Sequence, residues 1–227
     1  RDRFYIDFAN SDNGVALIGT RSGDSISYGS KATFTTNSID YPNVSYDPNT
    51  ANKFVGVYRD GGNSNYGTSV AGSVSGTSIS FGSAVVFNSG TTNDGVISFD
   101  PNTANKYVVA YDDAGDSSKG KAIVGTISGT SLSYGTESQY SAGTSINDVA
   151  FNPNKANQFV VAYRDSSSPF YGFVVVGTVS GTSISYSSPI QLQAGRSDDP
   201  KISFDPNTSG RFIVSYLDKG NSDKGTV

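Results

Sequence analysis

The residue types that perform most enzyme chemistry are missing from this sequence. Its 227 residues include no Cys, no His, no Met and no Trp. Without Cys there are no disulfides and no thiolate nucleophiles, and without His there is no imidazole base and no His-ligated metal. Serine–histidine and cysteine–histidine catalysis are therefore excluded, and we expect no cofactor.

Carboxylates are the acid–base groups that remain, and their positions favour a structural role. A two-carboxylate glycosidase needs a protonated acid opposite a second carboxylate. Glu137 is the only Glu, and it falls on or beside an outer strand, so an Asp-based glycosidase is the least favoured function. The Asp residues recur at equivalent places, as expected of side chains that cap turns. Three of them precede a proline, namely Asp47, Asp100 and Asp205. Four others end a predicted strand, namely Asp60, Asp113, Asp165 and Asp218.

One acidic segment has the composition of a cation-binding loop. Asp112, Asp113 and Asp116 are close enough in sequence to offer oxygen ligands to a hard cation. The corresponding segments elsewhere in the chain lack this spacing, and acidic surface turns are common. We therefore expect no metal site.

Two sequence markers recur along the chain and define a repeat. A Ser-Gly-Xaa-Ser segment begins at Ser22, Ser75, Ser128 and Ser180, and the period is about 53 residues. An aromatic residue followed by Asp or Asn, Pro and Asn keeps the same period: Tyr46, Phe99, Phe151 and Phe204. The expected organisation is a single repeat domain, with a partial unit at 1–38, repeats at 39–91, 92–144 and 145–196, and a partial unit at 197–227.

Each period contains four segments with strand character. In one copy they are 96–99, 106–111, 121–127 and 131–134, and the last can continue past Gly135. The middle two are apolar on consecutive residues, which predicts a sheet buried on both faces. Propeller blades meet that condition because each sheet packs between two neighbours. We predict an all-β fold, a β-propeller of four-stranded antiparallel blades; a stacked β-repeat array is the alternative.

The two ends of the chain fall in the middle of a repeat. Residues 3–6 resemble the second strand of a repeat, and so do residues 211–214. Incomplete blades would expose unpaired strand edges. We therefore expect an incomplete ring that belongs to a longer chain, or one that is completed by protein assembly partners or by self-association through the half-blades.

Two segments carry a resemblance to a known group of proteins. Val176–Tyr186 and Phe99–Tyr107 resemble propeller-type repeats found in large structural proteins of marine bacteria and their phages. The likeness covers nearly the whole chain but rests on simple motifs, and the short segment 9–13 departs from it. The resemblance implies an extracellular, cell-surface or virion location and supplies no catalytic residues.

Charge and hydropathy exclude two kinds of partner. The net charge is −4 and the isoelectric point is about 4.7, with no run of Lys or Arg, so nucleic acid is not an expected partner. No apolar stretch reaches the length that spans a bilayer, so membrane insertion is not expected either.

The connections between strands differ in how much they vary. An up-and-down blade places the first and third turns on one face and the remaining loops on the other. The first set is nearly identical in every copy and the second set differs, as expected where loops carry function on a fixed frame. Free drift of exposed loops explains the same variation. The loop residues able to stack on or hydrogen-bond a partner are Arg59, Tyr66, Arg164, Phe170, Tyr171 and Arg196.

These observations lead to a functional expectation and a rival. We expect a non-enzymatic extracellular or particle-surface scaffold with a structural or adhesive role. The rival is a carbohydrate-binding, lectin-like propeller with surface glycans as partners. The absence of Trp, and the failure of the loop aromatic residues to recur in each copy, weaken that rival.

Overall fold

The protein is built from antiparallel β-strands. Its structure, a computed structural model, describes residues 3–10, 13–219 and 224–226. The described residues contain no α-helix, and a short 3-10 helix, η1, occupies Ala114–Asp116. Nor do the described ranges include a helix able to cross a membrane. The expectation of an all-β fold is confirmed.

The strands form five successive groups, called units 1 to 5. Unit 1 comprises β1 (Arg3–Asn10), β2 (Asn13–Ser22), β3 (Ser25–Tyr28) and β4 (Ala32–Thr35). Unit 2 comprises β5 (Ile39–Tyr46), β6 (Lys53–Asp60), β7 (Tyr66–Ser75), β8 (Ser78–Phe81) and the start of β9 (Val85–Phe99). Unit 3 comprises the end of β9, β10 (Lys106–Asp113), β11 (Lys119–Ser128), β12 (Ser131–Tyr134) and β13 (Ser138–Ser141). Unit 4 comprises β14 (Thr144–Phe151), β15 (Gln158–Asp165), β16 (Tyr171–Ser180), β17 (Ser183–Tyr186) and the start of β18 (Ile190–Phe204). Unit 5 comprises the end of β18, β19 (Phe212–Asp218) and β20 (Lys224–Thr226).

Within a unit the strands pair in chain order. In unit 3, for example, β10 pairs with β9 on one side and β11 on the other, and β12 and β13 both pair with β11. The predicted continuation past Gly135 is present as a second short strand, β13, after a break at 135–137. The long strands β9 and β18 each serve twice, as the outer strand of one unit and the first strand of the next.

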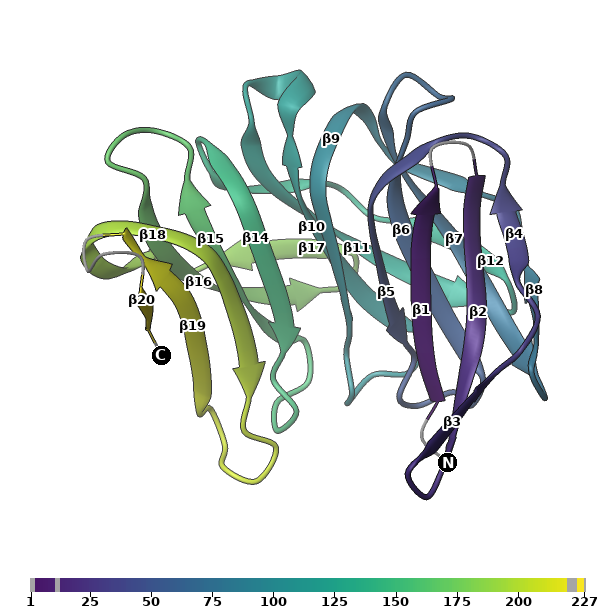
Figure 1. The fold of residues 1–227 in the computed structure, drawn as a ribbon. Helices are drawn as coiled ribbons and strands as arrows, with labels where there is room; N and C mark the ends of the chain where they lie inside the picture. Colours follow the sequence, from purple (N-terminus) through teal and green to yellow (C-terminus); the bar gives the residue numbers. More distant parts are fainter. Residues whose placement is uncertain (1–2, 11–12, 220–223, 227) are drawn as a thin grey trace.

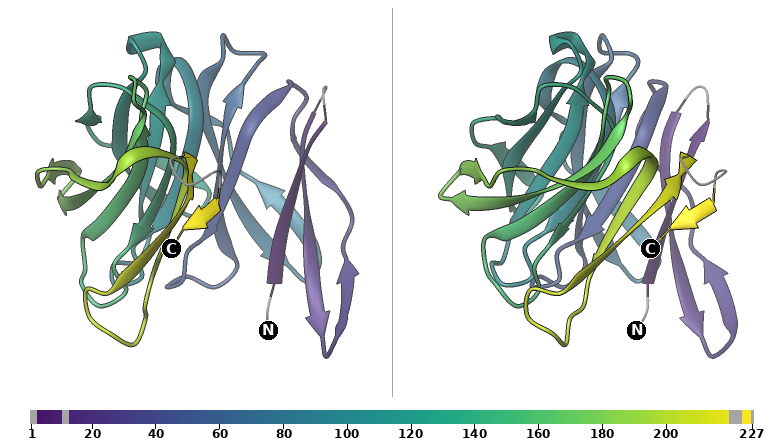
Figure 2. Two further views of the ribbon diagram at one scale, coloured as in Figure 1. Left: turned by 60° about the vertical axis from the view of Figure 1, so that its left-hand side comes forward. Right: turned by 90° about the vertical axis from the view of Figure 1, so that its left-hand side faces the viewer.

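The units follow one another around a central axis in a propeller-like arrangement (Figures 1 and 2). The first strands of units 2 to 5 are β5, β9, β14 and the end of β18, and they lie side by side near the axis. A stacked array does not describe this arrangement. The described strands form three separate hydrogen-bonded sheets: β1–β4, β5–β13 and β14–β20.

The hydrophobic core lies between neighbouring sheets. Ile18 of unit 1 packs with Phe54 and Val74 of unit 2, and Ile202 of unit 5 packs with Val160 and Ala162 of unit 4. Larger clusters fill the interfaces of units 2 and 3 and of units 3 and 4. The second strands of units 2, 3 and 4 are therefore buried on both sides, which confirms the inference from their consecutive apolar residues, whereas β19 of unit 5 is mostly exposed or half-buried.

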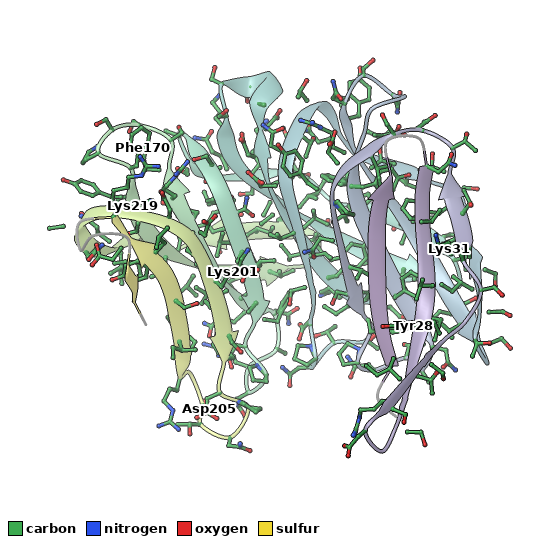
Figure 3. All side chains as sticks on the ribbon, viewed as in Figure 1. Tyr28, Lys31, Phe170, Lys201, Asp205 and Lys219 are labelled. Carbon is green, nitrogen blue, oxygen red and sulfur yellow. The ribbon has the colours of Figure 1, made fainter. Side chains whose placement is uncertain are left out.

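Backbone hydrogen bonds divide the connections between two opposite faces. On what we call the turn face, the third strand of a unit donates to the turn between its first two strands: Val74 to Asn52, Ile127 to Asn105 and Val179 to Asn157. On the loop face, the first strand of a unit donates to the long loop of the unit before it: Thr92 to Asn65, Thr144 to Ser118 and Ser197 to Phe170. The expected division is confirmed, and Figure 3 shows Asp205 at the turn-face end and Phe170 at the loop-face end.

Candidate functional site

Aspartates on the turn face stabilise the turns and also link neighbouring units. Asp100 Oδ1 accepts a hydrogen bond from Asn102 N at 2.8 Å, which closes its own turn. Its Oδ2 accepts from Asn157 N of the next unit, also at 2.8 Å. Asp47 makes the equivalent two bonds, to Asn49 N and to Asn105 N. The predicted capping role is confirmed, and the link between units is an addition that the sequence did not show.

Aspartates at the ends of the second strands do not all share one role. Asp60 and Asp165 cap their loops, accepting from Gly62 N at 3.0 Å and Ser167 N at 2.7 Å. The capping prediction is wrong for Asp113. Its Oδ2 binds the ammonium group of Lys121 at 2.8 Å, because Tyr111 and Lys121 face each other across the strand pair and bring that charge beside the strand end.

Arginines on the loop face fasten one unit to the next. Arg59 donates to Asp40 Oδ2 of its own unit (2.7 Å from Nη2) and to Asn93 Oδ1 of the following unit (2.8 Å). Arg164 repeats the arrangement two units later. It donates to Ser145 Oγ at 2.6 Å and to Asp198 Oδ1 at 2.6 Å.

The other predicted loop residues join Arg164. The guanidinium carbons of Arg164 and Arg196 lie 5.5 Å and 5.1 Å from the centre of the Phe170 ring. Arg196 also forms two hydrogen bonds to the Asp198 carboxylate, and it pairs with Tyr171 across the β16–β18 ladder. Burial would raise the pKa of Asp198, but the bonds from Arg196 and Arg164 outweigh it and hold the pKa below its usual value.

The six predicted residues therefore form two separate groups. Arg164, Phe170, Tyr171 and Arg196 lie together between units 4 and 5. The other two belong to unit 2, where Arg59 stacks over Tyr41 and Tyr66 lies at the start of β7, opposite Asp60. Most of the arginine donors already bind other residues of the chain, so these groups chiefly brace the loop face.

A different set of residues surrounds the axis at the loop-face end of the first strands. Each of three first strands, β5, β9 and β18, has an irregularity there, with a non-glycine residue at positive φ: Tyr41 (51°), Asp94 (47°) and Asp199 (51°). The strands bend around a hollow of about 160 Å³, which we call the axial hollow. It is lined by residues from units 2, 3, 4 and 5: Tyr41, Pro42, Asn43, Asp94, Gly95, Val96, Asn147 and Lys201.

The axial hollow combines an aromatic ring with polar groups of different kinds. Tyr41 is 42% exposed, and the guanidinium carbon of Arg59 lies 4.8 Å from its ring centre. Asn147 is buried and donates to Asp94 O at 3.1 Å, but its own Oδ1 has no hydrogen-bond partner. Lys201 is exposed on β18, where Figure 3 labels it. The lining therefore offers a ring, an acceptor and a cation to one small space.

A partly buried carboxylate stands next to the axial hollow. Asp148 follows Asn147 on β14, and its Oδ2 accepts a hydrogen bond from Ile202 N at 2.9 Å. Burial raises the pKa of Asp148, and the nearby charge of Lys201 and two backbone hydrogen bonds oppose that effect only in part.

The sequence analysis did not identify the axial hollow. A signal was present, because Pro42, Gly95 and Pro200 fall at equivalent repeat positions directly after the three residues with positive φ. Proline and glycine at one repeat position are typical of an irregular strand.

Comparison with known proteins gives the fold of this chain but not its family. No family model and no curated protein matches the sequence. Among solved structures, Sqt1 from Chaetomium thermophilum is 16% identical, with 80% of this chain and 42% of that chain covered and a TM-score of 0.52. An exo-β-1,3-galactanase from Phanerochaete chrysosporium, solved with β-1,3-galactotriose, is 10% identical, with 97% and 59% covered and a TM-score of 0.53. The galactanase solved with galactose gives a TM-score of 0.51 at the same identity and coverage.

This comparison corrects the functional expectation. The chain spans about half the length of these solved structures, and at such low identity the likeness shows a shared all-β fold alone. The sequence was interpreted as a non-enzymatic scaffold with a structural or adhesive role. That interpretation is overturned, because proteins that share the fold include a carbohydrate-processing enzyme. Because this fold also occurs in an enzyme, the fold gives no support to the expectation that the chain is not an enzyme.

Proposed function

We propose that this chain is a carbohydrate-binding propeller of four-stranded blades, and that the saccharide binds in the axial hollow. The observation that carries the proposal is the lining of that hollow. Units 2 to 5 together place an exposed tyrosine, a buried amide oxygen without a partner, a carboxylate and an ammonium group around one space. A few convergent polar groups beside an aromatic surface are typical of small-molecule sites.

Three of the lining residues have a chemical role toward a sugar. The Tyr41 ring, held by the Arg59 guanidinium at 4.8 Å, provides a flat surface for the C–H face of a pyranose. Asn147 Oδ1 accepts a hydrogen bond from a sugar hydroxyl, which satisfies an oxygen that is otherwise buried without a partner. Lys201 donates to a hydroxyl or ring oxygen of the sugar.

The fold comparison supports this class of ligand. The galactanase structures contain galactose and β-1,3-galactotriose, and their fold covers nearly all of this chain. Because the sequence identity is 10%, we take from this only the choice of a first ligand.

The test is a calorimetric or NMR titration with β-1,3-galactotriose and a panel of neutral oligosaccharides. We expect the wild type to bind one of them and Tyr41→Ala to bind it at least tenfold more weakly, roughly 1.4 kcal/mol. Tyr28→Ala is the matched control, because Tyr28 is also an exposed tyrosine but lies on β3, far from the hollow (Figure 3). The proposal fails if no saccharide binds, or if Tyr41→Ala binds as tightly as the control.

A second candidate function is hydrolysis of the bound saccharide. The observation that favours it is Asp148, whose pKa is raised by burial, as a general acid requires. Asp94, on the neighbouring first strand, supplies a second carboxylate at the hollow. Release of reducing sugar that is lost in Asp148→Asn, with saccharide binding retained, would support hydrolysis. Binding without any turnover would leave the chain a binding protein.

A further inference from the structure

A second cavity lies between units 2 and 3, and it shares no lining residue with the axial hollow. Its volume is about 490 Å³. One side is formed by the β9 segment that ends unit 2, and the other by the end of β10, η1, β11 and the link between β12 and β13 in unit 3. The lining residues are Phe87, Asn88, Ser89, Gly90, Asp113, Gly115, Asp116, Lys121, Ile123, Gly135 and Glu137.

The hydrogen-bond donors of Lys121 are all in use. Its Nζ lies 2.8 Å from Asp113 Oδ2, 3.0 Å from Asp116 Oδ2 and 3.1 Å from Glu137 Oε1. An ammonium group has three N–H donors, so these three contacts account for all of them. Tyr111, fully buried, donates its hydroxyl to Glu137 Oε2 at 3.0 Å.

The charge of this cluster is negative. Three carboxylates face Lys121, and the further ion pair of Lys119 with Asp116, at 2.9 Å, still leaves one negative charge in excess. Lys121 Nζ occupies the point on which the carboxylates converge. In keeping with this, the described part of the chain has no group of three His, Cys, Asp or Glu residues able to hold a metal ion.

One oxygen of the cluster has no partner. The Asp113 side chain is only 5% exposed, and its Oδ1 is buried without a hydrogen bond. This oxygen is directed toward two glycines of the lining. A Cβ atom added to Gly90 would lie 2.6 Å from it, and one added to Gly115 would lie 3.3 Å from it. Asp113 Oδ1 is therefore covered by the backbone of these two glycines, and a larger residue at either position would crowd it.

Asp113 has an equivalent Asp in other units, but Lys121 and Glu137 are not part of the repeating frame. The position of Lys121 is held by Thr68 in unit 2 and Phe173 in unit 4, each paired with the tyrosine equivalent to Tyr111. Glu137 is the only Glu in the chain. The other units fold without the charges of Lys121 and Glu137, so packing of the repeat does not explain these two residues.

We propose that this cavity binds a small organic cation, a primary amine or a guanidine, whose N–H group donates to Asp113 Oδ1. The ligand must be a donor, because the lining offers a buried acceptor while its own ammonium donors are all used. It must also be cationic, because a positive charge balances the excess carboxylate. A hydrogen bond from a charged donor to a buried carboxylate is among the stronger ones in proteins.

The test is an NMR titration of the full chain with agmatine, which carries both a guanidinium and a primary amine. We expect saturable shifts of the Gly90 and Gly115 backbone amides and no such shifts with D-glucose. Gly90→Ala places a methyl group in front of Asp113 Oδ1 and should weaken agmatine binding at least tenfold. Asp113→Asn should also weaken it, because the carboxylate charge is lost.

Two variants keep the test decisive. Asp165→Asn is the matched control, because Asp165 holds the equivalent position in unit 4 but caps its own loop, and it should bind agmatine as the wild type does. Asp113→Asn could fail to fold, since it leaves Lys121 with fewer carboxylates, and Gly90→Ala then decides because it removes no charge. Absent shifts, equal binding by Gly90→Ala, or equal shifts with D-glucose would each overturn the proposal.

Discussion

The turn face and the loop face hold the same units together by different means. On the turn face, Asp47 and Asp100 each close their own turn and bind the backbone of the following unit in the same way. On the loop face, Arg59 and Arg164 link neighbouring units, but unit 3 has Asp112 at the equivalent position. The turn face is thus fastened by aspartates that repeat from one unit to the next. The loop face is fastened by arginines that unit 3 lacks.

This difference explains where ligand recognition can develop. A loop that is not needed to hold the units together can change its side chains without loss of the fold. Both the axial hollow and the cavity between units 2 and 3 include side chains found in one unit only, such as Tyr41 and Lys201 in the first and Lys121 and Glu137 in the second. The following predictions test this division, starting with the largest expected effect.

Replacing Asp100 on the turn face should be the most destabilising single change. Asp100→Ala removes a fully buried carboxylate and leaves the N–H groups of Asn102 and Asn157 without their acceptor. We expect a loss of about 3–5 kcal/mol in the free energy of unfolding, since each bond to a charged group contributes roughly 1.5–3 kcal/mol. Urea denaturation measures it. Asp205→Ala is the control and should cost less, because Asp205 Oδ1 caps its own turn while its Oδ2 binds Arg211 of the same unit.

On the loop face, Arg164→Ala should cost more than Arg59→Ala. Arg164 pairs with Asp198, whose side chain is 8% exposed, whereas the partner of Arg59 is Asp40, 52% exposed. We expect about 2 kcal/mol for Arg164→Ala and below about 1 kcal/mol for Arg59→Ala, because exposed ion pairs contribute little. Equal losses in urea denaturation would show that burial of the acidic partner does not set the strength of these links.

Asp112 should make the protein less stable as the pH rises. Burial raises the pKa of Asp112 to about 6, although a hydrogen bond from Asn93 opposes the effect. A folded-state pKa above the unfolded value favours the protonated form, so this contribution to stability is complete below about pH 4 and is lost as the pH rises through 6. Asp112→Asn should therefore melt a few °C higher than the wild type at pH 7. The two should converge near pH 4, and a constant difference across this range would contradict the assignment.

Tyr41→Ala should leave stability almost unchanged. Tyr41 is 42% exposed and lies at a positive φ, so its side chain adds little to packing. We expect a change within about 0.5 kcal/mol in urea denaturation, which is typical of surface substitutions. A loss above about 2 kcal/mol would show that Tyr41 supports the loop face structurally.

The sequence predicted the regular parts of the molecule well. Recurrence of the Ser-Gly and Asp-Pro-Asn segments located the turns, and apolar runs such as 107–111 located strands buried on both sides. These features depend on local periodicity and on turn chemistry, which a single repeat already contains. The capping role of Asp47 and Asp100 followed from the same recurrence.

The candidate sites could not be predicted because they depend on contacts between units. The axial hollow brings together Tyr41, Asp94, Asn147 and Lys201, which are about one repeat apart and meet only because the sheets turn around an axis. The different role of Asp113 depends on the pairing of Tyr111 with Lys121, which fixes where the ammonium group lies. Neither the angle between sheets nor the strand register can be obtained from composition.

The most direct test of the central claim is a crystal structure of the chain soaked with β-1,3-galactotriose, or with the best ligand of the titration panel. The account predicts a sugar ring stacked on Tyr41, with a hydroxyl within hydrogen-bond distance of Asn147 Oδ1. A saccharide bound only elsewhere, or a titration in which no saccharide binds, would contradict the assignment of the axial hollow as the binding site.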